Sequence, residues 1–265
     1  MNPKENQNHP VPKSHPRYES LKYRHKIIEG MKKLVVAEAG LIAHGRGECF
    51  DYILGEKTSF SAKKAIKAAV AALLLAKKPV ISVNGNVAAL IPEELVIFSN
   101  LINAPLEINL FYHKEGRIKA IKNVLQKAGA TDIHGIDPNK MTELEGLESN
   151  RRKVELIAQA DLVMVPLEDG DRTEALKRLN KSVIAVDLNP ISRTSLWADI
   201  TIIDNIVRTI PEMINITKEF KKLNKSDLND IVKNFDNKKN IQETLHLIIE
   251  YIEKQKTKAF ETIGF

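Results

Sequence analysis

Several positively charged residues near the start of the chain have the spacing of an anion-binding site. His15 and Arg17 lie where Pro16 favours the start of a helix. Arg24 follows Arg17 by seven residues, which places both guanidinium groups on one face of that helix. Because the amide groups at a helix start attract anions, these side chains could hold a phosphate or a carboxylate. A basic helix that simply faces water would have the same sequence, so both interpretations stay open.

Two further groups combine polar side chains with glycine. The segment 43–48 reads AHGRGE, in which two glycines let a ligand approach the backbone while Arg46 reaches towards it. An exposed turn would have the same composition. Asn84 and Asn86 directly follow an apolar stretch typical of a buried strand, so their amides would lie at the ligand-binding edge of a sheet. The sequence contains neither Gly-x-Gly-x-x-Gly nor Gly-x-x-x-x-Gly-Lys-Ser/Thr, so the common dinucleotide and P-loop sites are unsupported.

The fourth group is rich in acidic residues and follows two other apolar stretches. Asp187 comes at the end of one stretch, where a carboxylate can accept hydrogen bonds from ribose hydroxyls. Arg193, six residues later, can pair with a phosphate. Asp169 and Asp171 could hold Mg²⁺, which commonly uses one or two carboxylates together with the phosphates of its ligand. The same carboxylates would suit a capped helix start, and this alternative stays open.

Charge and composition limit the class of protein. The 265 residues include 40 Lys and Arg against 34 Asp and Glu, and ten of those 40 are Arg. Residues 1–33 contain eight basic and three acidic side chains, so most of the net charge of +6 lies there. Aromatic residues make up 5% of the chain, which argues against a nucleic-acid-binding surface. No apolar stretch is long enough to span a membrane, and a single cysteine, Cys49, fits a reducing, cytoplasmic location.

The hydrophobic pattern predicts the elements that must position these residues. Strands are expected at 79–83, 106–111, 131–134, 161–166, 182–188 and 199–203. Helices are expected at 16–37, 59–76, 92–103, 114–128, 151–159, from Asp171 onward, and at 206–223, 226–234 and 240–258, with loops at 39–58 and 137–150. Apolar strands that alternate with helices form a parallel sheet with helices on both faces, here with additional helices at both termini. We therefore expect a flexible N-terminus at 1–12, a single domain at 13–258 and a tail at 259–265.

Five longer stretches match one known family in order along the chain. They read KSHPRYESLKYR, EAGLIAHGRGECFDYILGEKT, KPVISVNGNVAALIPEE, VMVPLEDGDRTEAL and VDLNPISRTSLWADITIIDNIVR. These stretches resemble the archaeal 4-phosphopantoate–β-alanine ligase (phosphopantothenate synthetase) family. The resemblance implies an ATP-dependent ligase of coenzyme A biosynthesis that joins 4-phosphopantoate to β-alanine through an acyl-adenylate, releasing diphosphate and then AMP. It also implies a Rossmann-like fold, a homodimer and dependence on Mg²⁺.

The resemblance further implies roles for individual residues. Contacts with ATP would fall on the residues that match the family motifs: Arg24, Arg46, Asp187, Leu188, Asn189, Arg193, Thr194, Asn205 and Ile206. Among these, Arg24, Arg46 and Arg193 would stabilise negative charge during the reaction. The remaining polar residues are expected to bind phosphopantoate: His15, Arg17, Asn84 and Asn86. A nicotinamide-binding oxidoreductase on a similar sheet is the alternative function, and no residue is assigned to β-alanine.

Overall fold

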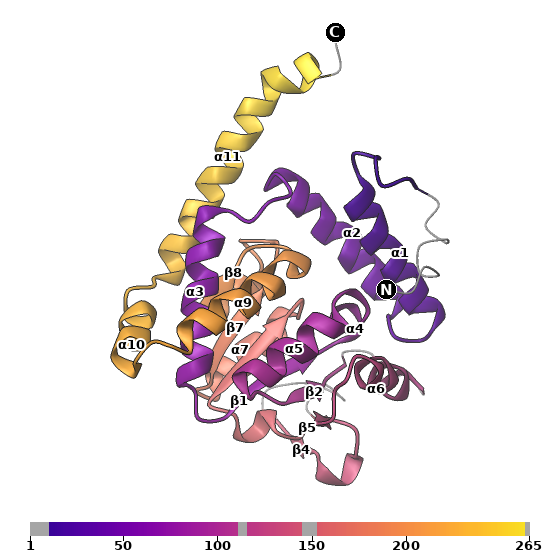
Figure 1. Ribbon diagram of the computed structural model, residues 1–265, viewed down its shortest axis with the longest axis vertical. Coiled ribbons are helices and arrows are strands. Elements are labelled where there is room, and N and C mark those ends of the chain that lie inside the picture. Colours follow the sequence, from indigo (N-terminus) through magenta and orange to yellow (C-terminus); the bar gives the residue numbers. More distant parts are fainter. Residues whose placement is uncertain (1–10, 111–115, 145–152, 263–265) are drawn as a thin grey trace.

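Six parallel strands form the centre of the molecule (Figure 1). The computed structural model describes residues 11–110, 116–144 and 153–262. The strands are β1 (Pro79–Val83), β2 (Leu106–Ile108), β3 (Ile133–His134), β6 (Leu162–Pro166), β7 (Ser182–Val186) and β8 (Ile200–Ile202). Their order across the sheet is β3-β2-β1-β6-β7-β8, which is the strand order of a Rossmann fold. The expected parallel sheet is confirmed, and its topological switch point lies between β1 and β6.

The strands are buried on both faces, as their nearly continuous apolar sequences predict. Alternate residues of each strand face two separate hydrophobic clusters. In β1, for example, Ile81 and Val83 face the larger cluster, whereas Val80 faces the smaller one. Because one residue of shift would exchange the two faces, this alternation fixes the register, in which Ile81 is paired with Met164.

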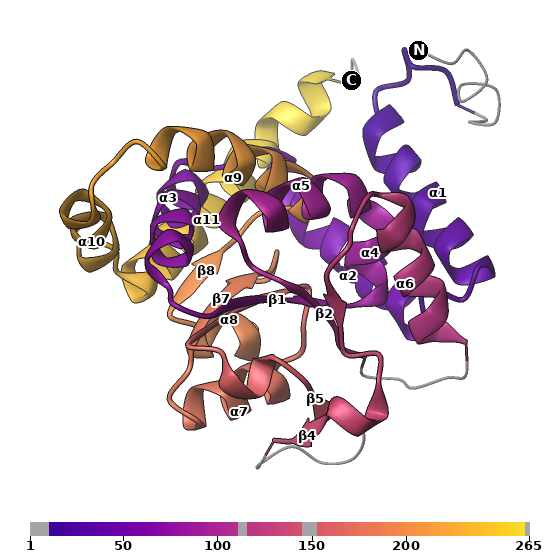
Figure 2. The same cartoon turned by 60° about the horizontal axis from the view of Figure 1, so that its bottom comes forward.

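Helices cover both faces of the sheet, as expected (Figure 2). One face carries α3 (Phe60–Leu75), α5 (Pro92–Ile102), α6 (Arg117–Lys127) and α9 (Ile206–Phe220). The short helix α4 (Gly85–Leu90) follows β1 directly. The opposite face carries α7 (Gly170–Arg178) and α8 (Arg193–Trp197), together with the short strands β4 (Thr142–Glu143) and β5 (Lys153–Val154). All helices that follow sheet strands therefore begin at the edge where those strands end.

The segment expected as a loop at 39–58 is mainly a helix, so that prediction is wrong. It forms α2 (Glu38–Ile53), which crosses the carboxyl edge of the sheet. The three glycines of α2 are unfavourable in a helix, so the sequence did not indicate one. At least one of these glycines is nevertheless required by packing. A Cβ atom at Gly40 would collide with the Asn86 side chain, because α2 lies close to α4 at this point. Glycine here marks a close approach between two helices.

The first helix ends earlier than predicted. α1 (Tyr18–Lys32) ends because Leu34 adopts a left-handed backbone conformation, with a φ of 62°. The amides of Val35 and Val36 then donate hydrogen bonds to the Gly30 carbonyl, at 2.8 and 3.1 Å. These bonds turn the chain back into the core, where both valines are buried.

The helix expected at 151–159 is also wrong over its described part. Residues 153–154 form β5, and Ile157–Gln159 form one 3₁₀ turn. The buried carboxylate of Glu107 accepts hydrogen bonds from the amides of Glu155, Leu156 and Ile157, at 2.9, 2.7 and 2.8 Å. A side chain from β2 thus binds these amides and fixes the local turn.

The C-terminal region is helical, as expected. α10 (Lys225–Lys233) packs against α3 and is followed by the long helix α11 (Asn237–Thr262), which begins three residues before the predicted helix and ends after it. The far end of α11 extends beyond the rest of the molecule (Figure 1). No helix among the described residues is both long enough and apolar enough to cross a lipid bilayer.

Candidate functional site

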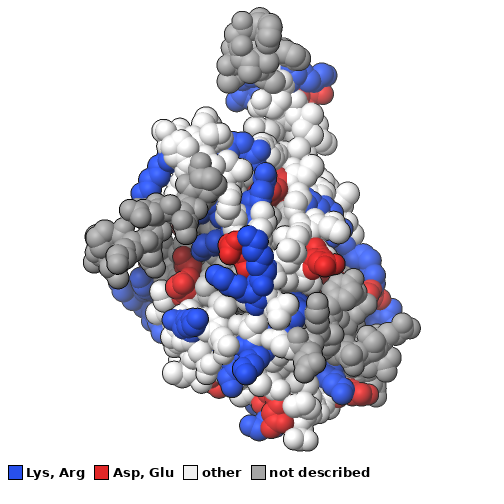
Figure 3. All heavy atoms as spheres, turned by 90° about the vertical axis from the view of Figure 1, so that its right-hand side faces the viewer, with Lys and Arg blue, Asp and Glu red and all other residues white. Residues whose placement is uncertain are grey.

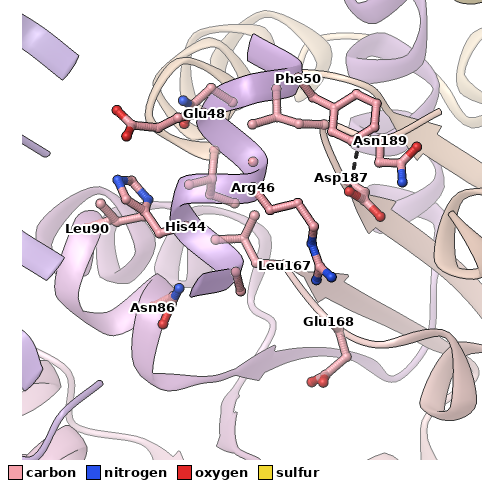
Figure 4. A pocket seen from close by; sticks show the side chains of 15 residues that line it. His44, Arg46, Glu48, Phe50, Asn86, Leu90, Leu167, Glu168, Asp187 and Asn189 are labelled. Carbon is pink, nitrogen blue, oxygen red and sulfur yellow. Dashed lines mark hydrogen bonds between the residues drawn. The ribbon is translucent and has the colours of Figure 1, made fainter. Parts of the chain in front are cut away.

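Polar side chains from four strands gather where the sheet ends beneath α2. Asn84 follows β1, Glu168 follows β6, Asp187 follows β7 and Asn205 lies after β8. A pocket at this edge, which we name the central pocket, extends from α2 to Glu168, Asp187 and Asn205, whereas Asn84 lies outside its lining (Figure 4). It lies next to the topological switch point, where α/β proteins of this topology bind their ligands.

The loop after β7 supplies one wall of the central pocket. Asp187 is half-buried, and its carboxylate accepts hydrogen bonds from the Asn189 amide at 3.0 Å and the Ser192 hydroxyl at 2.5 Å (Figure 4). Burial raises the pKa of Asp187, whereas these hydrogen bonds and the positive charge of Arg46 act in the opposite direction. Leu188 and Asn189 line the same wall. Three residues that were expected to contact ATP therefore lie together on one wall.

The opposite wall comes from α2. Arg46 points from α2 towards the strand ends and lies between Asp187 and Glu168 (Figure 4). Leu167, directly after β6, has a left-handed backbone conformation with a φ of 53° and lines the pocket beneath Arg46. Such a conformation costs free energy in a branched residue and is often retained near ligand sites. It allows the chain to turn sharply and present Glu168 to the pocket.

The chain after β8 closes one end of the central pocket. Asn205 and Ile206 line it, as the resemblance implies. The Asn205 side chain donates a hydrogen bond of 2.8 Å to Asp51 of α2. Asp51 also accepts two hydrogen bonds from Arg208, at 2.6 and 3.1 Å, and Arg208 bonds in turn to the buried carboxylate of Asp204. This buried network fixes Asn205 and attaches α2 to the start of α9.

A second pocket, the Arg17 pocket, lies between α1, α2 and the start of α9. Its cationic lining includes Lys13, Arg17 and Arg208, and its carboxylates come from Glu19, Glu48, Asp51 and Glu56. The Arg17 guanidinium stacks 4.2 Å from the centroid of the Tyr52 ring and donates a 2.8 Å hydrogen bond to Ser20. His15 and His44 also face this pocket. Lys and Arg side chains gather on the face of the molecule that carries α1 and α2 (Figure 3).

A third pocket, the Arg117 pocket, lies on the other side of the central pocket. Its polar lining consists of Arg46, Asn84, Asn86, Arg117, Glu168 and Asp169. The Asn84 side chain accepts a hydrogen bond from the Val87 amide and donates two others, to the carbonyls of Pro166 and Leu167. The Asn86 amide donates to the Gly40 carbonyl. Both asparagines thus also fix the backbone around the pocket.

The four residues expected to bind phosphopantoate do not come together. Asn84 and Asn86 line the Arg117 pocket, whereas His15 and Arg17 line the Arg17 pocket. Sequence reasoning did not single out Arg117, although it lies on a helix that follows a strand in a chain with few arginines. Scarcity of Arg was the signal that could have identified it.

Three of the expected ATP contacts lie outside the lining of the central pocket. Arg193 is largely exposed, and its guanidinium pairs with Asp171 and Glu174 on α7, at 2.6 and 2.5 Å. Thr194 is buried and donates a hydrogen bond to the Glu168 carbonyl. Arg24 pairs with Glu48 at 3.0 Å, and Glu48 lines the central pocket. These three residues support the pocket walls in this arrangement.

The candidate metal ligands also differ in position. Asp169 lines the Arg117 pocket and caps α7 by accepting a hydrogen bond from the Arg172 amide, whereas Asp171 pairs with Arg193. In the parts of the chain that the structure describes, no three His, Cys, Asp or Glu side chains form a metal-binding cluster. Glu168 and Asp169 beside the central pocket fit a magnesium ion that takes its other ligands from phosphates and water.

The fold and these pockets define an α/β enzyme of Rossmann type with a polar site at its switch point. A sequence profile described as phosphopantothenate/pantothenate synthetase matches residues 61–251. Similar proteins named 4-phosphopantoate–β-alanine ligase occur in Thermococcus kodakarensis and Thermococcus onnurineus. The first is 55% identical over 89% of this chain and 90% of its own, and the second is 53% identical over 95% of each chain.

A protein of the same name from Methanosarcina mazei is 46% identical over 95% of this chain and 98% of its own. The chain therefore belongs to the phosphopantothenate/pantothenate synthetase family. These comparisons support the ligase predicted from the sequence and give no support to the oxidoreductase alternative.

Proposed function

We propose that this protein is an ATP-dependent ligase that joins 4-phosphopantoate to β-alanine, giving 4′-phosphopantothenate, AMP and diphosphate in coenzyme A biosynthesis. The observation that carries the proposal is the central pocket, in which Arg46 and the half-buried carboxylate of Asp187 line one cavity beside the switch point. Relatives that align over nearly the whole chain share the name of this reaction. The acidic strand end suits a ribose, and Arg46 suits a phosphate.

The reaction needs an activated carboxylate, because oxide is a poor leaving group. A carboxylate oxygen of phosphopantoate attacks the α-phosphorus of ATP, and diphosphate leaves with the electrons of the broken P–O bond. The neutral amine of β-alanine then attacks the acyl carbon, and AMP leaves as the amide forms and the amine loses a proton. Arg46 would stabilise the charge that gathers at the α-phosphate, so positioning and electrostatics could supply much of the rate.

Magnesium would supply further positive charge next to the triphosphate. Glu168 and Asp169 are the residues that would hold it, since both carboxylates lie beside the central pocket. Asp171 suits this role less well, because it lies outside the lining of both pockets and its carboxylate faces Arg193. Mg²⁺ commonly keeps several waters and needs only one or two protein carboxylates.

A homodimer completes the proposal. Leu247, Ile249 and Ile252 are exposed on α11, which extends beyond the body of the molecule, and Phe60 is exposed at the start of α3. Apolar side chains on such a projecting helix are typical of an interface between subunits. Light scattering should therefore give twice the chain mass, and the pair Ile249→Glu and Ile252→Glu should give the monomer mass.

The test of the activity is incubation with ATP, Mg²⁺, 4-phosphopantoate and β-alanine, followed by measurement of nucleotides and the amide. We expect AMP and 4′-phosphopantothenate in equal amounts, and no amide without ATP. ADP in place of AMP would contradict the acyl-adenylate. Turnover of NAD, with no amide formed, would favour the oxidoreductase alternative.

A further inference from the structure

The Arg17 pocket adjoins the central pocket. His44, Glu48 and Asn205 line both pockets, so the two pockets meet at these three side chains. Figure 4 shows His44 and Glu48 on the same side of α2. Lys13 and Arg17, in contrast, line the Arg17 pocket but not the central pocket. The Arg17 pocket therefore has one side that is shared with the central pocket and another side that carries two cations.

Arg17 is held in place without an ion pair. Its Cζ atom lies 4.2 Å from the centroid of the Tyr52 ring, and its Nη2 donates a 2.8 Å hydrogen bond to Ser20. Both of these partners are neutral. Within residues 11–110, 116–144 and 153–262, no carboxylate pairs with Arg17, and its buried Nε has no hydrogen-bond partner. The positive charge of this guanidinium is therefore available to an anionic group of a ligand.

The other charges of the Arg17 pocket largely cancel in pairs. Three of its four carboxylates form ion pairs at 3.3, 3.0 and 2.6 Å: Glu19 with Lys22, Glu48 with Arg24 and Asp51 with Arg208, which also pairs with Asp204. In the described part of the chain, the lining residues Lys13, Arg17 and Glu56 form no ion pair. When every pair is counted with both of its members, the charges nearly balance. Such a pocket suits a molecule with one carboxylate and one ammonium group better than a doubly charged phosphate.

The side shared with the central pocket has no excess of positive charge. Glu48 is paired with Arg24, and the side chain of Asn205 is neutral. Burial lowers the pKa of His44 more than the charge of Glu48 raises it, which favours the neutral imidazole at neutral pH. An ammonium group can thus lie on this side without facing an unpaired cation, whereas a carboxylate is attracted to Arg17 on the other side.

We propose that the Arg17 pocket binds β-alanine, with the carboxylate on Arg17 and the amine beside His44 at the central pocket. This inference rests on the proposed ligase function, in which the amine must reach an acyl group held in the central pocket. It gives Arg17 a different substrate from the one expected from the sequence, because the guanidinium binds the amino acid and not the phosphorylated acid.

The test compares β-alanine with 3-aminopropanamide, which has the same amine but no carboxylate, as substrates of the full-length protein. We expect Arg17→Gln to lower the ratio of kcat/KM for the two amines by roughly 10- to 100-fold, because a charge-assisted contact with the carboxylate is lost. A partial loss of folded enzyme would lower both values equally and leave the ratio unchanged. Lys32→Gln is the matched control, since Lys32 is an exposed cation at the other end of α1 that pairs with Glu29.

A second measurement separates binding of the amino acid from activation of the acid. Without β-alanine, ATP and 4-phosphopantoate should support exchange of labelled diphosphate into ATP, and Arg17→Gln should change the rate of this exchange by no more than about twofold. Either an unchanged ratio for the two amines or a loss of the exchange in folded Arg17→Gln would overturn the inference. Failure of the ligase proposal would differ, because the wild type would then show neither the exchange nor the amide.

Discussion

The Arg117 pocket and the Arg17 pocket lie on either side of the central pocket, and both contain arginine. Arg117 is held by the backbone, through the Val35 carbonyl and the space left by Gly85. Arg17 is held by side chains, through Ser20 and the Tyr52 ring. Arg46 and Arg117 share the first pocket with two carboxylates, whereas three cationic side chains share the second with four carboxylates. The same type of side chain is therefore positioned by the backbone in one pocket and by neighbouring side chains in the other.

Replacement of Arg46, which lines both the Arg117 pocket and the central pocket, should have the largest effect. Arg46→Ala removes a cation from both the central pocket and the Arg117 pocket, so we expect turnover to fall by roughly 10²-fold or more. Steady-state kinetics with 4-phosphopantoate and ATP would measure this. Arg178→Ala is the control, because Arg178 is exposed and pairs with Glu174 on the surface. Near wild-type turnover in Arg46→Ala would contradict the role of Arg46.

The second prediction concerns the ion pairs that hold the Arg17 pocket. Asp51 is 6% exposed and accepts hydrogen bonds from Arg208 and Asn205. Asp51→Asn leaves Arg208 with less compensation, so we expect a loss of roughly 1–3 kcal/mol in the free energy of unfolding. Denaturant unfolding would measure it. If the two pockets act independently, the preference for phosphopantoate over pantoate should not change. A large change in this preference would show that the Arg17 pocket also takes part in binding the acid.

The third and smallest effect is a pH dependence of stability that comes from His44, which lines the Arg17 pocket and the central pocket. Burial lowers the pKa of His44, and the nearby Arg24 lowers it further, although Glu48 acts in the opposite direction. In the unfolded chain His44 binds a proton below its ordinary pKa of about 6.5, whereas in the folded protein it binds that proton only at a lower pH. Stability should therefore fall as the pH falls through 6.5 towards the lowered pKa, and level off below it.

His44→Gln removes the difference in proton binding between the folded and unfolded chains. As the pH falls from 6.5 towards the lowered pKa, the stability of the variant should therefore rise relative to that of the wild type. Thermal unfolding between pH 5 and pH 8 would measure the change, for which His246→Gln on the exposed face of α11 is the control. A gap that stays constant with pH would show that His44 does not titrate as described.

Much of the fold could be predicted because its strands are short apolar runs separated by helices. The strand at 79–83 matches β1 residue for residue, and the sheet is parallel. The prediction failed at α2 because the need for glycine at Gly40 comes from a contact with Asn86, 46 residues away. It failed at 151–159 because Glu107 on a distant strand binds the amides there. Local sequence patterns do not contain such long-range contacts.

The position of a residue at the sheet edge could be predicted where it follows a strand directly, as Asp187 does, whereas Asn205 was indicated by the family resemblance alone. The sequence did not predict which charged side chains form ion pairs with one another. Arg193 faces Asp171 and Glu174 because α8 lies against α7, and this pairing crosses about 20 residues of sequence. Arg117 became visible only when the fold brought it to Gly85. Charge compensation is a property of the folded arrangement.

The hydrogen bonds of Asn84 have a mechanical consequence. Its side chain bonds to the carbonyls of Pro166 and Leu167, and so it joins the end of β1 to the end of β6 across the line between the two halves of the sheet. Parting of the two halves would break both bonds. The sheet should therefore behave as a rigid base when substrates enter or leave. Any opening movement is then left to α2, whose displacement would uncover all three pockets together.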